Sequence, residues 1–255
     1  MKNFFLNSSE SNNFLLKKKI LGLCVTEGRY SIADLSRELN TSIPTTTKLV
    51  EELIEEGFLE DLGKLDTNGG RRPNIYGLKA SAGYFIGTDV RRHHVSIAIA
   101  DFRGDIVDYI DSIPFKVESS ADSFRNLCSI IKDNIRKFGI KEEEVLAYGL
   151  NLSGRVNNET GYCFTYFIGE DRPIASLMEE ELGGRVFVEN DSRAMTYGEY
   201  ICGVGKNEKD MLFINVTWGL GMGMILNGTL LYGKSGFSGE LGPFPMLNFD
   251  KICHC

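Results

Sequence analysis

Three short helical patterns followed by two strand patterns occupy the first 80 residues, and few small folds accommodate that order. In each helical pattern the apolar side chains recur at the spacing of one buried helix face. Ser31 and Ser42 precede the second and third patterns as N-caps, and Pro44 stands in a first turn, where its missing N–H costs nothing. The three patterns cover residues 14–25, 32–39 and 44–56.

A polar turn separates the two strand patterns. Residues 58–62 and 74–78 carry the strand-forming side chains, and residues 67–73 between them contain paired glycines, paired arginines and a proline. Three helices and a hairpin predict a winged helix-turn-helix, in which the last helix enters the major groove of DNA and the hairpin is the wing. We expect residues 1–80 to form this DNA-binding domain.

The exposed face of the third helix is predicted to contact DNA. Short hydroxyl side chains reach base edges and phosphates without crowding the groove, and a lysine adds a phosphate contact. Arg71 and Arg72 in the wing are expected to enter the minor groove, where the negative potential favours arginine. The alternative is a solvated helix face and a loop that its arginines keep soluble. The residues predicted on the helix are Ser42, Thr45, Thr46, Thr47 and Lys48.

The remaining charges set a condition on this prediction. Lys17, Lys18 and Lys19 are further candidates for phosphate contacts, whereas the glutamates of residues 51–56 must face away from the DNA. The first 80 residues hold eleven basic and eleven acidic residues, so the rest of the chain carries the whole formal net charge of −7. A neutral module binds DNA when its cations share one face, and the acidic remainder is not expected to touch phosphate.

Composition argues against several other classes of protein. Apolar residues make up 42% and charged residues 25% of the chain, as in soluble globular proteins. No apolar run approaches the roughly 20 residues that span a bilayer, and the N-terminus lacks the apolar stretch of a signal peptide. We therefore expect a cytoplasmic protein with no membrane partner. The cysteines are scattered except for the last pair, which argues against a disulfide framework.

Beyond residue 80 the pattern changes to alternating strands and helices. Strand patterns occur at residues 84–90, 94–101, 105–110 and 145–152, and an amphipathic helix at residues 123–138. The strand–turn–strand theme returns in residues 211–232, with Asn227-Gly228 as a hairpin turn. Two units of one style suggest a duplicated α/β lobe. We expect residues 81–255 to form this second domain.

Three motifs of the second domain resemble the ROK family of repressors and sugar kinases. Residues 227–242 are similar to the family signature that leads into its sugar-binding glutamate, here Glu240. Residues 188–199 resemble the segment with the catalytic aspartate of the kinases, here Asp191, and residues 150–156 resemble the loop that closes over the sugar. The resemblance covers essentially the whole chain after the linker and includes the wing.

This resemblance implies a fold and a ligand site. The fold is α/β: the winged helix is followed by an incomplete actin/hexokinase-like (ribonuclease H-like) duplicated domain. A few well-placed acceptors and donors suit a polyhydroxylated ligand. The alternative for Asn190 and Asp191 is that they only cap the next helix. The implied ligand-binding residues are Ser153, Gly154, Asn190, Asp191 and Glu240, with Asp191 as the base in a kinase.

Both phosphate loops of the kinases are altered in this sequence. Where the kinases have Asp-x-Gly-Gly-Thr, this chain has Arg91 and Arg92 in place of the glycines, and their Cβ atoms obstruct the close approach that glycine allows. In the second loop, Trp218 replaces a phosphate-contacting threonine. We expect that ATP is not held and that Asp191 is a vestigial base, although the two arginines would attract an anion.

The zinc motif of the family is incomplete. Pro243 stands at the histidine position, and only Cys253 and Cys255 keep their register, whereas a structural zinc site needs four ligands. We expect no metal cofactor unless residues beyond Cys255 supply the missing ligands. The family's second lobe continues further, so the sequence is expected to be a fragment of a longer protein, or a truncated product with an exposed sheet edge and uncovered apolar faces.

These patterns favour a sugar-responsive DNA-binding regulator of carbohydrate metabolism, most simply a repressor. A sugar or sugar phosphate would shift the equilibrium between DNA-competent and incompetent arrangements. A homodimer or higher homo-oligomer would present two wings to a double-stranded operator. Two alternatives stay open: an active ATP-dependent sugar kinase that uses Asp191, and a remnant that binds DNA without responding to a ligand.

Overall fold

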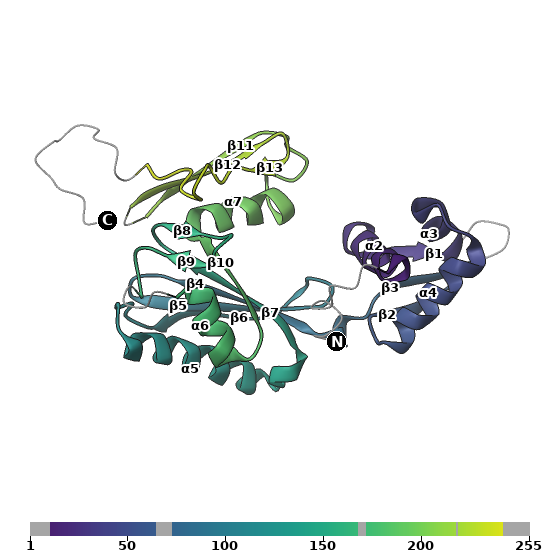
Figure 1. Cartoon of the computed structure of the whole chain (residues 1–255), viewed down its shortest axis with the longest axis horizontal. Helices are drawn as coiled ribbons and strands as arrows, with labels where there is room; N and C mark the ends of the chain where they lie inside the picture. Colours follow the sequence, from purple (N-terminus) through teal and green to yellow (C-terminus); the bar gives the residue numbers. More distant parts are fainter. Residues whose placement is uncertain (1–10, 65–72, 168–171, 218, 242–255) are drawn as a thin grey trace, which may run out of the picture. The chain divides into compact units, whose positions relative to one another are not determined.

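The computed structural model describes residues 11–64, 73–167, 172–217 and 219–241 (Figure 1). The chain divides into two compact units. The first comprises residues 1–85, 99–108 and 143–146, and the second comprises residues 86–98, 109–142 and 147–255. Within the described residues no helix is both long and apolar enough to cross a membrane.

The first unit begins with the predicted three helices and hairpin. The helices are α2 (Asn12–Glu27), α3 (Ile32–Leu39) and α4 (Ile43–Glu55), and the strands are β1 (Arg29–Ser31), β2 (Leu59–Lys64) and β3 (Asn74–Leu78). The strands form an antiparallel sheet in the order β1-β3-β2. Both predicted caps are confirmed, because Ser31 Oγ accepts from the Asp34 amide and Ser42 Oγ from the Thr45 amide. Strand β1, between the first two helices, was not predicted.

The core of the first unit extends beyond the winged helix. Leu35, Leu49 and Leu53 are buried between the helices, and Phe102 joins the same cluster from a later turn. The ring of Phe102 lies 5.8 Å from that of Phe58. In the same turn, Arg103 Nε donates to the Leu78 carbonyl oxygen at 2.8 Å, and the guanidinium pairs with Glu60. The wing strands therefore pack on a turn that lies outside the first 80 residues.

A five-stranded sheet forms the centre of the α/β region. Its strands are β4 (Tyr84–Val90), β5 (His94–Asp101), β6 (Ile106–Pro114), β7 (Val145–Leu152) and β10 (Arg185–Asn190), in the order β10-β7-β4-β5-β6. Helices α5 (Ala121–Phe138) and α6 (Ile174–Leu182) lie on the same side of this sheet (Figure 1). The remaining short elements are η1 (Ala80–Ala82), η2 (Glu142–Glu144), β8 (Val156–Asn157) and β9 (Tyr162–Cys163).

The second unit ends with a helix packed on a small antiparallel sheet. Helix α7 (Asp191–Cys202) contacts β11 (Met211–Val216) and β12 (Leu220–Leu226), and β13 (Thr229–Leu230) completes the sheet. The contact is close, because a Cβ added at Gly221 or Gly223 would overlap the hydroxyls of Ser192 and Thr196. Asn227 (φ 51°) and Gly228 (φ 74°) form the predicted hairpin turn.

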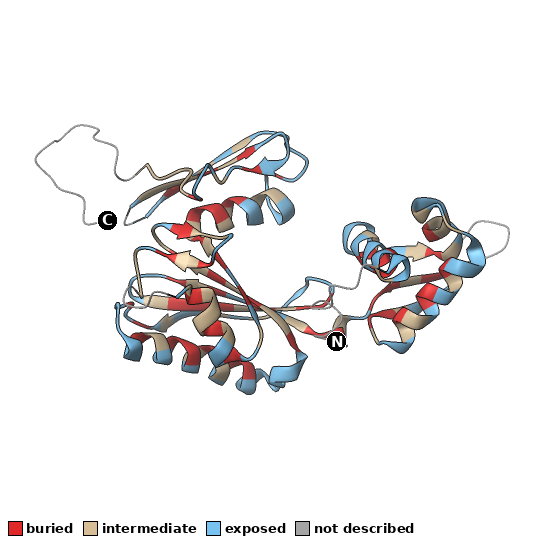
Figure 2. Cartoon of the chain, viewed as in Figure 1, coloured by how far each residue is buried: buried red, intermediate tan, exposed pale blue. Residues whose placement is uncertain are grey.

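These elements confirm the predicted fold class, a winged helix-turn-helix followed by an α/β domain. One face of β11 is uncovered among the described residues (Figure 2). Leu212, Ile214 and Val216 on this face are 63%, 51% and 74% exposed.

Candidate functional site

The first candidate site is the start of α4. Thr45 and Lys48 are exposed there, and Thr47 is half-buried with its hydroxyl donating to the Ile43 carbonyl oxygen at 2.9 Å. Ser42 is exposed as well, but its Oγ is occupied by the cap and by a 2.8 Å hydrogen bond with Thr45 Oγ1. Arg71 and Arg72, the predicted wing contacts, lie outside the described residues.

Thr46 does not belong to this face. Its side chain has no exposed area, and its hydroxyl donates to the Ser42 carbonyl oxygen at 3.1 Å and is hydrogen-bonded to Thr41 Oγ1 at 2.8 Å. The prediction that Thr46 contacts DNA is therefore wrong, because a side chain enclosed by its own domain cannot reach a phosphate or a base. It holds the beginning of α4 in place instead.

Lys17 is not available for a phosphate contact either. The side chain is 11% exposed, and its ammonium lies 2.8 Å from Glu52 Oε2 and 2.6 Å from Glu56 Oε1. Burial alone would lower the pKa of Lys17, but its hydrogen bonds to the two carboxylates raise it. The same hydrogen bond holds the pKa of Glu52 below its usual value. Lys18 and Lys19 remain exposed, and so do Glu51 and Glu55, whereas Glu52 and Glu56 are bound by Lys17 of α2.

The second candidate site lies where two parallel strands end. In the paired strands β7 and β10, Leu152 is the partner of Asn190. Ser153 and Gly154 follow the first strand, and Asp191 follows the second. Since the carboxyl ends of parallel strands meet at one edge of a sheet, these residues come together. The structure thus joins motifs that are far apart in the sequence.

The Asp191 carboxylate is held by four hydrogen bonds. Its Oδ2 accepts from Ser153 Oγ at 2.7 Å. Its Oδ1 accepts from the Ser192 amide at 2.7 Å, Ser192 Oγ at 3.2 Å and Asn190 Nδ2 at 3.1 Å. A carboxylate has about four acceptor positions. For Asp191 to accept from a ligand hydroxyl, one of these donors, most simply the Ser153 hydroxyl, has to turn toward the ligand.

Asn190 serves the site indirectly. It is 7% exposed and caps α7, with Oδ1 accepting from the Arg193 amide. Both of its amide protons are used, one on the Gly154 carbonyl oxygen at 2.9 Å and one on Asp191. These hydrogen bonds show that Asn190 positions Gly154 and Asp191, and the prediction that it also contacts the ligand stays a prediction. Asn190 therefore caps α7, as the alternative predicted, and its amide group also binds two residues of the candidate site.

Two further acids share the electrostatic environment of Asp191. Burial raises the pKa of half-buried Glu240 and of Asp89, and the charge of Asp191 adds to both shifts. Arg193 and Arg155 oppose the shift at Glu240. At Asp89 the Arg91 guanidinium opposes it, with Nε 2.8 Å from Oδ2. The Oδ1 atom of Asp89 is buried without a hydrogen-bond partner among the described residues.

The altered first phosphate loop is an ordinary hairpin turn. The Arg91 amide donates to the His94 carbonyl oxygen at 2.9 Å, and no residue from Arg91 to His93 has a positive φ. Arg92 is exposed. The turn therefore has no conformational need for glycine. Trp218 of the second loop lies outside the described residues.

Sequence reasoning missed Arg193. This side chain has no exposed area, its Nε lies 2.7 Å from Glu189 Oε1, and its Nη2 donates to the Val156 carbonyl oxygen at 2.9 Å. Its guanidinium carbon lies 6.0 Å from the centre of the Tyr232 ring. No local pattern marks this pair, because Glu189 lies at the end of strand β10 and Arg193 at the start of helix α7.

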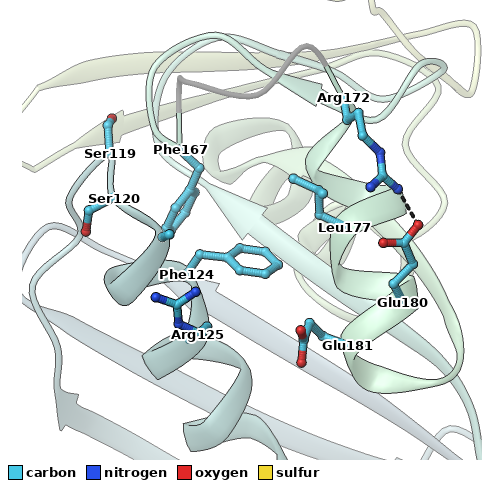
Figure 3. Close-up of a pocket in the computed structure, with 10 residues that line it drawn as sticks. Ser119, Ser120, Phe124, Arg125, Phe167, Arg172, Leu177, Glu180 and Glu181 are labelled. Carbon is cyan, nitrogen blue, oxygen red and sulfur yellow. Dashed lines mark hydrogen bonds and ion pairs between the residues drawn. The ribbon is translucent and has the colours of Figure 1, made fainter.

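A separate cavity of about 380 Å³ lies between α5 and α6 (Figure 3). Phe124 and Phe167 point toward each other there with ring centres 6.2 Å apart, and Arg172 pairs with Glu180. None of the predicted ligand-binding residues lines it. Within the described ranges no three histidine, cysteine or acidic side chains could hold a metal. Cys253 and Cys255 lie outside those ranges.

Comparison with known families identifies both parts. A model described as "Winged helix-turn-helix DNA-binding" matches residues 15–60, and that of the ROK family matches residues 85–255. The chain belongs to the ROK family. Its ROK part contains the whole Ser153–Asp191 site and Glu240.

The ROK relatives of known name include repressors. The chain is 29% identical over 246 residues to the xylose repressor of Bacillus subtilis, covering 96% of this chain and 62% of the relative. It is 25% identical over 229 residues to the DNA-binding transcriptional dual regulator NagC of Escherichia coli, covering 89% and 55%. The chain thus spans less than two thirds of the length of these relatives.

Solved structures agree on the fold. A ROK family transcriptional regulator, described as a homologue of the E. coli MLC protein, superposes with a TM-score of 0.74 at 23% identity, covering 94% of this chain and 61% of that one. A ROK hexokinase from Thermus thermophilus gives 0.53 at 26% identity, covering 68% and 56%. The regulator match includes the DNA-binding module, whereas the kinase match covers about the ROK part alone.

Proposed function

We propose that this chain is a sugar-responsive DNA-binding regulator, a repressor of carbohydrate genes, acting in the cytoplasm as a homodimer. The supporting observation is that one chain joins a winged helix, with Thr45 and Lys48 exposed on α4, to the hydrogen-bonded Ser153–Asp191 site of a ROK domain. Relatives named as repressors of xylose and N-acetylglucosamine genes favour the same role. Residues 1–80 would bind the operator, and residues 81–255 the effector.

DNA binding is tested on an operator selected from a pool of random duplexes with the purified chain. Affinity should fall steeply between low and moderate salt, because the bound lysines and arginines release counterions. Thr45→Ala with Lys48→Ala should weaken binding about tenfold, the effect of removing roughly 1.4 kcal/mol of contacts. The control, Ser129→Ala with Lys137→Ala on exposed positions of α5, should bind like the parent. Equal loss in both double variants contradicts the proposal.

Effector binding is tested by melting and by operator release. D-xylose, N-acetylglucosamine and their phosphates are added separately, and a ligand at 100 times its Kd should stabilise the chain by about 2.7 kcal/mol. The same sugar should release the selected operator. If no sugar changes either quantity, the chain binds DNA without a ligand response.

We also propose that kinase activity is lost. In support of this, the first phosphate loop carries Arg91, which is bound to Asp89, and the acceptor positions of Asp191 are filled by the protein. A coupled ATP assay with the sugars above should show no turnover above background. Turnover that disappears in Asp191→Asn would instead establish a kinase, because Asp191 would then be a working base.

A further inference from the structure

The loop of residues 232–240 reaches the ligand site from the small antiparallel sheet. The Leu231 amide donates to the Met224 carbonyl oxygen at 2.9 Å before the loop, and the Met222 amide donates to the Gly239 carbonyl oxygen at 3.1 Å at its end. Within it, the Ser238 amide donates to the Tyr232 carbonyl oxygen at 3.1 Å. The loop is therefore a closed turn that carries Glu240 at its end.

Strand β8 lies directly against this loop. A Cβ at Gly236 would lie 3.1 Å from the Val156 carbonyl oxygen, so the loop backbone comes very close to that strand. The same carbonyl oxygen accepts from Arg193 Nη2 at 2.9 Å. Arg193 and the loop thus meet at one carbonyl group, and the Tyr232 ring lies beside the guanidinium.

The Arg193 guanidinium is only partly satisfied in this arrangement. Nε is bound by Glu189 and Nη2 by Val156, but Nη1 is buried with no acceptor among the described residues. Ser238 Oγ, on the loop, is likewise buried without a partner there. A fully buried guanidinium with an unsatisfied donor costs free energy, and its neighbours Glu189, Val156 and Tyr232 all belong to the ligand-site segments.

We propose that Arg193 is a positioning residue of the ligand site: it holds the 232–240 loop on β8 and the start of α7, and thereby sets the place of Glu240. Only the statement that Glu240 binds sugar rests on the proposed function. The charged groups around Glu240 are Arg193, Arg155 and Asp191. Of these, Arg193 is also bound to the Val156 carbonyl oxygen of β8, the strand under the loop.

The test uses the full chain with Glu189→Gln and Arg193→Gln together, which removes both members of the buried ion pair and leaves no unpaired charge. Amide hydrogen exchange of the 232–240 loop should become at least about fivefold faster without ligand, while β7 and β10 keep their rates. Arg185→Gln, at an exposed arginine on β10, is the control and should leave the loop protected. Unchanged loop exchange in the double variant overturns the inference.

Sugar affinity supplies a second readout that a purely structural role would not move. Glu240 accepts sugar hydroxyls as a carboxylate, so binding is lost as the pH falls through its pKa. Because Arg193 lowers that pKa, its removal should move the loss of binding to higher pH and weaken affinity about tenfold. If the double variant does not fold, Arg193→Lys is used. Lysine keeps the positive charge but cannot bind Glu189 and the Val156 carbonyl oxygen together. Amide exchange in the loop should therefore become faster, while the pH dependence of sugar binding should not change.

The outcomes separate the two proposals. A parent chain that binds no sugar, with a loop that loosens in the variant, defeats the proposed function and leaves the positioning role of Arg193 intact. A variant that binds sugar with the parental affinity and pH profile defeats the role of Arg193 while the proposed function stands.

Discussion

At the level of single residues, Lys17 determines where the acidic side of α4 points. Its ammonium lies between Glu52 and Glu56, so two of the glutamates that would repel phosphate are bound inside the domain. Lys48, 3.9 Å from Glu52 and 73% exposed, stays at the surface. Thr45 and Lys48 stay exposed at the start of the helix, where DNA contacts are predicted.

Lys17→Met should destabilise the first unit by about 1–2 kcal/mol, a figure reduced from that of a fully buried pair because both carboxylates are about a third exposed. The pKa of Glu52 is lowered in the folded state, so the pair stabilises above the unfolded pKa and this contribution is lost as pH falls through the folded one. Urea unfolding measures this: the free energies of unfolding of the parent and of Lys17→Met should differ at neutral pH and converge at acidic pH. Lys18→Met, at an exposed lysine, should show no such change.

Substitutions at Thr46 and Thr45 should affect different properties, stability at Thr46 and DNA affinity at Thr45. Thr46→Val keeps the volume but removes the hydrogen bonds to Ser42 and Thr41, and should cost about 1 kcal/mol of stability with little effect on operator affinity. Thr45→Ala should lower affinity with little effect on stability. Denaturation and DNA titration of both variants check this. A large loss of affinity in Thr46→Val at unchanged stability would return Thr46 to the DNA interface.

At the level of elements, the loop after β7 depends on Gly154. Its φ is 95°, and an added Cβ would overlap Thr165 Oγ1, whose hydroxyl accepts from the Arg155 amide. Gly104 has a similar φ of 90° but open space around it. The two positions separate backbone strain from steric overlap.

Gly104→Ala should lower the free energy of unfolding by about 1 kcal/mol, because the positive φ strains any side chain even where space is open. Gly154→Ala should cost about 1–3 kcal/mol more, because the overlap displaces the loop that binds Asn190. It should also abolish sugar binding, whereas Gly104→Ala should not. Melting temperatures and sugar titrations compare the two, and equal costs would show that the loop tolerates a side chain.

At the scale of the whole molecule, β11 exposes three apolar side chains on one face among the described residues of the second unit, Leu212, Ile214 and Val216. Contiguous exposed apolar side chains mark an interface or a site of aggregation. Strand β11 pairs with β12, and the Met222 amide of β12 donates to the Gly239 carbonyl oxygen next to Glu240. The exposed face and the predicted ligand residue Glu240 therefore belong to the same small sheet and its loop.

Ile214→Lys should therefore reduce self-association of the chain at micromolar concentration, because it charges the centre of that face. Val25→Lys, at an isolated valine that is 66% exposed, is the matched control and should leave association unchanged. Light scattering during size-exclusion chromatography measures both. Identical masses for the parent and both variants would contradict self-association through this face.

Local sequence was sufficient for the helices and hairpin of the winged helix and for strands such as β4, β5 and β7, but it did not predict β1, α6 or β10. Serine caps, the Asn227-Gly228 turn and the alternating strand 94–101 depend on interactions between near neighbours, which a pattern records directly. The motifs with Asp191 and Glu240 were recognisable for the same reason.

Which polar side chains end up inside depended on packing. Periodicity marks the apolar face of a helix but does not say which lysine, threonine or arginine at its margin is covered by another element. Lys17 is covered because α2 meets α4, and Thr46 because Thr41 folds back over it. Arg193 is buried because β8 and the 232–240 loop come together above α7. The contacts of Lys17 and Arg193 join residues distant in sequence, so they exist only once the chain has folded.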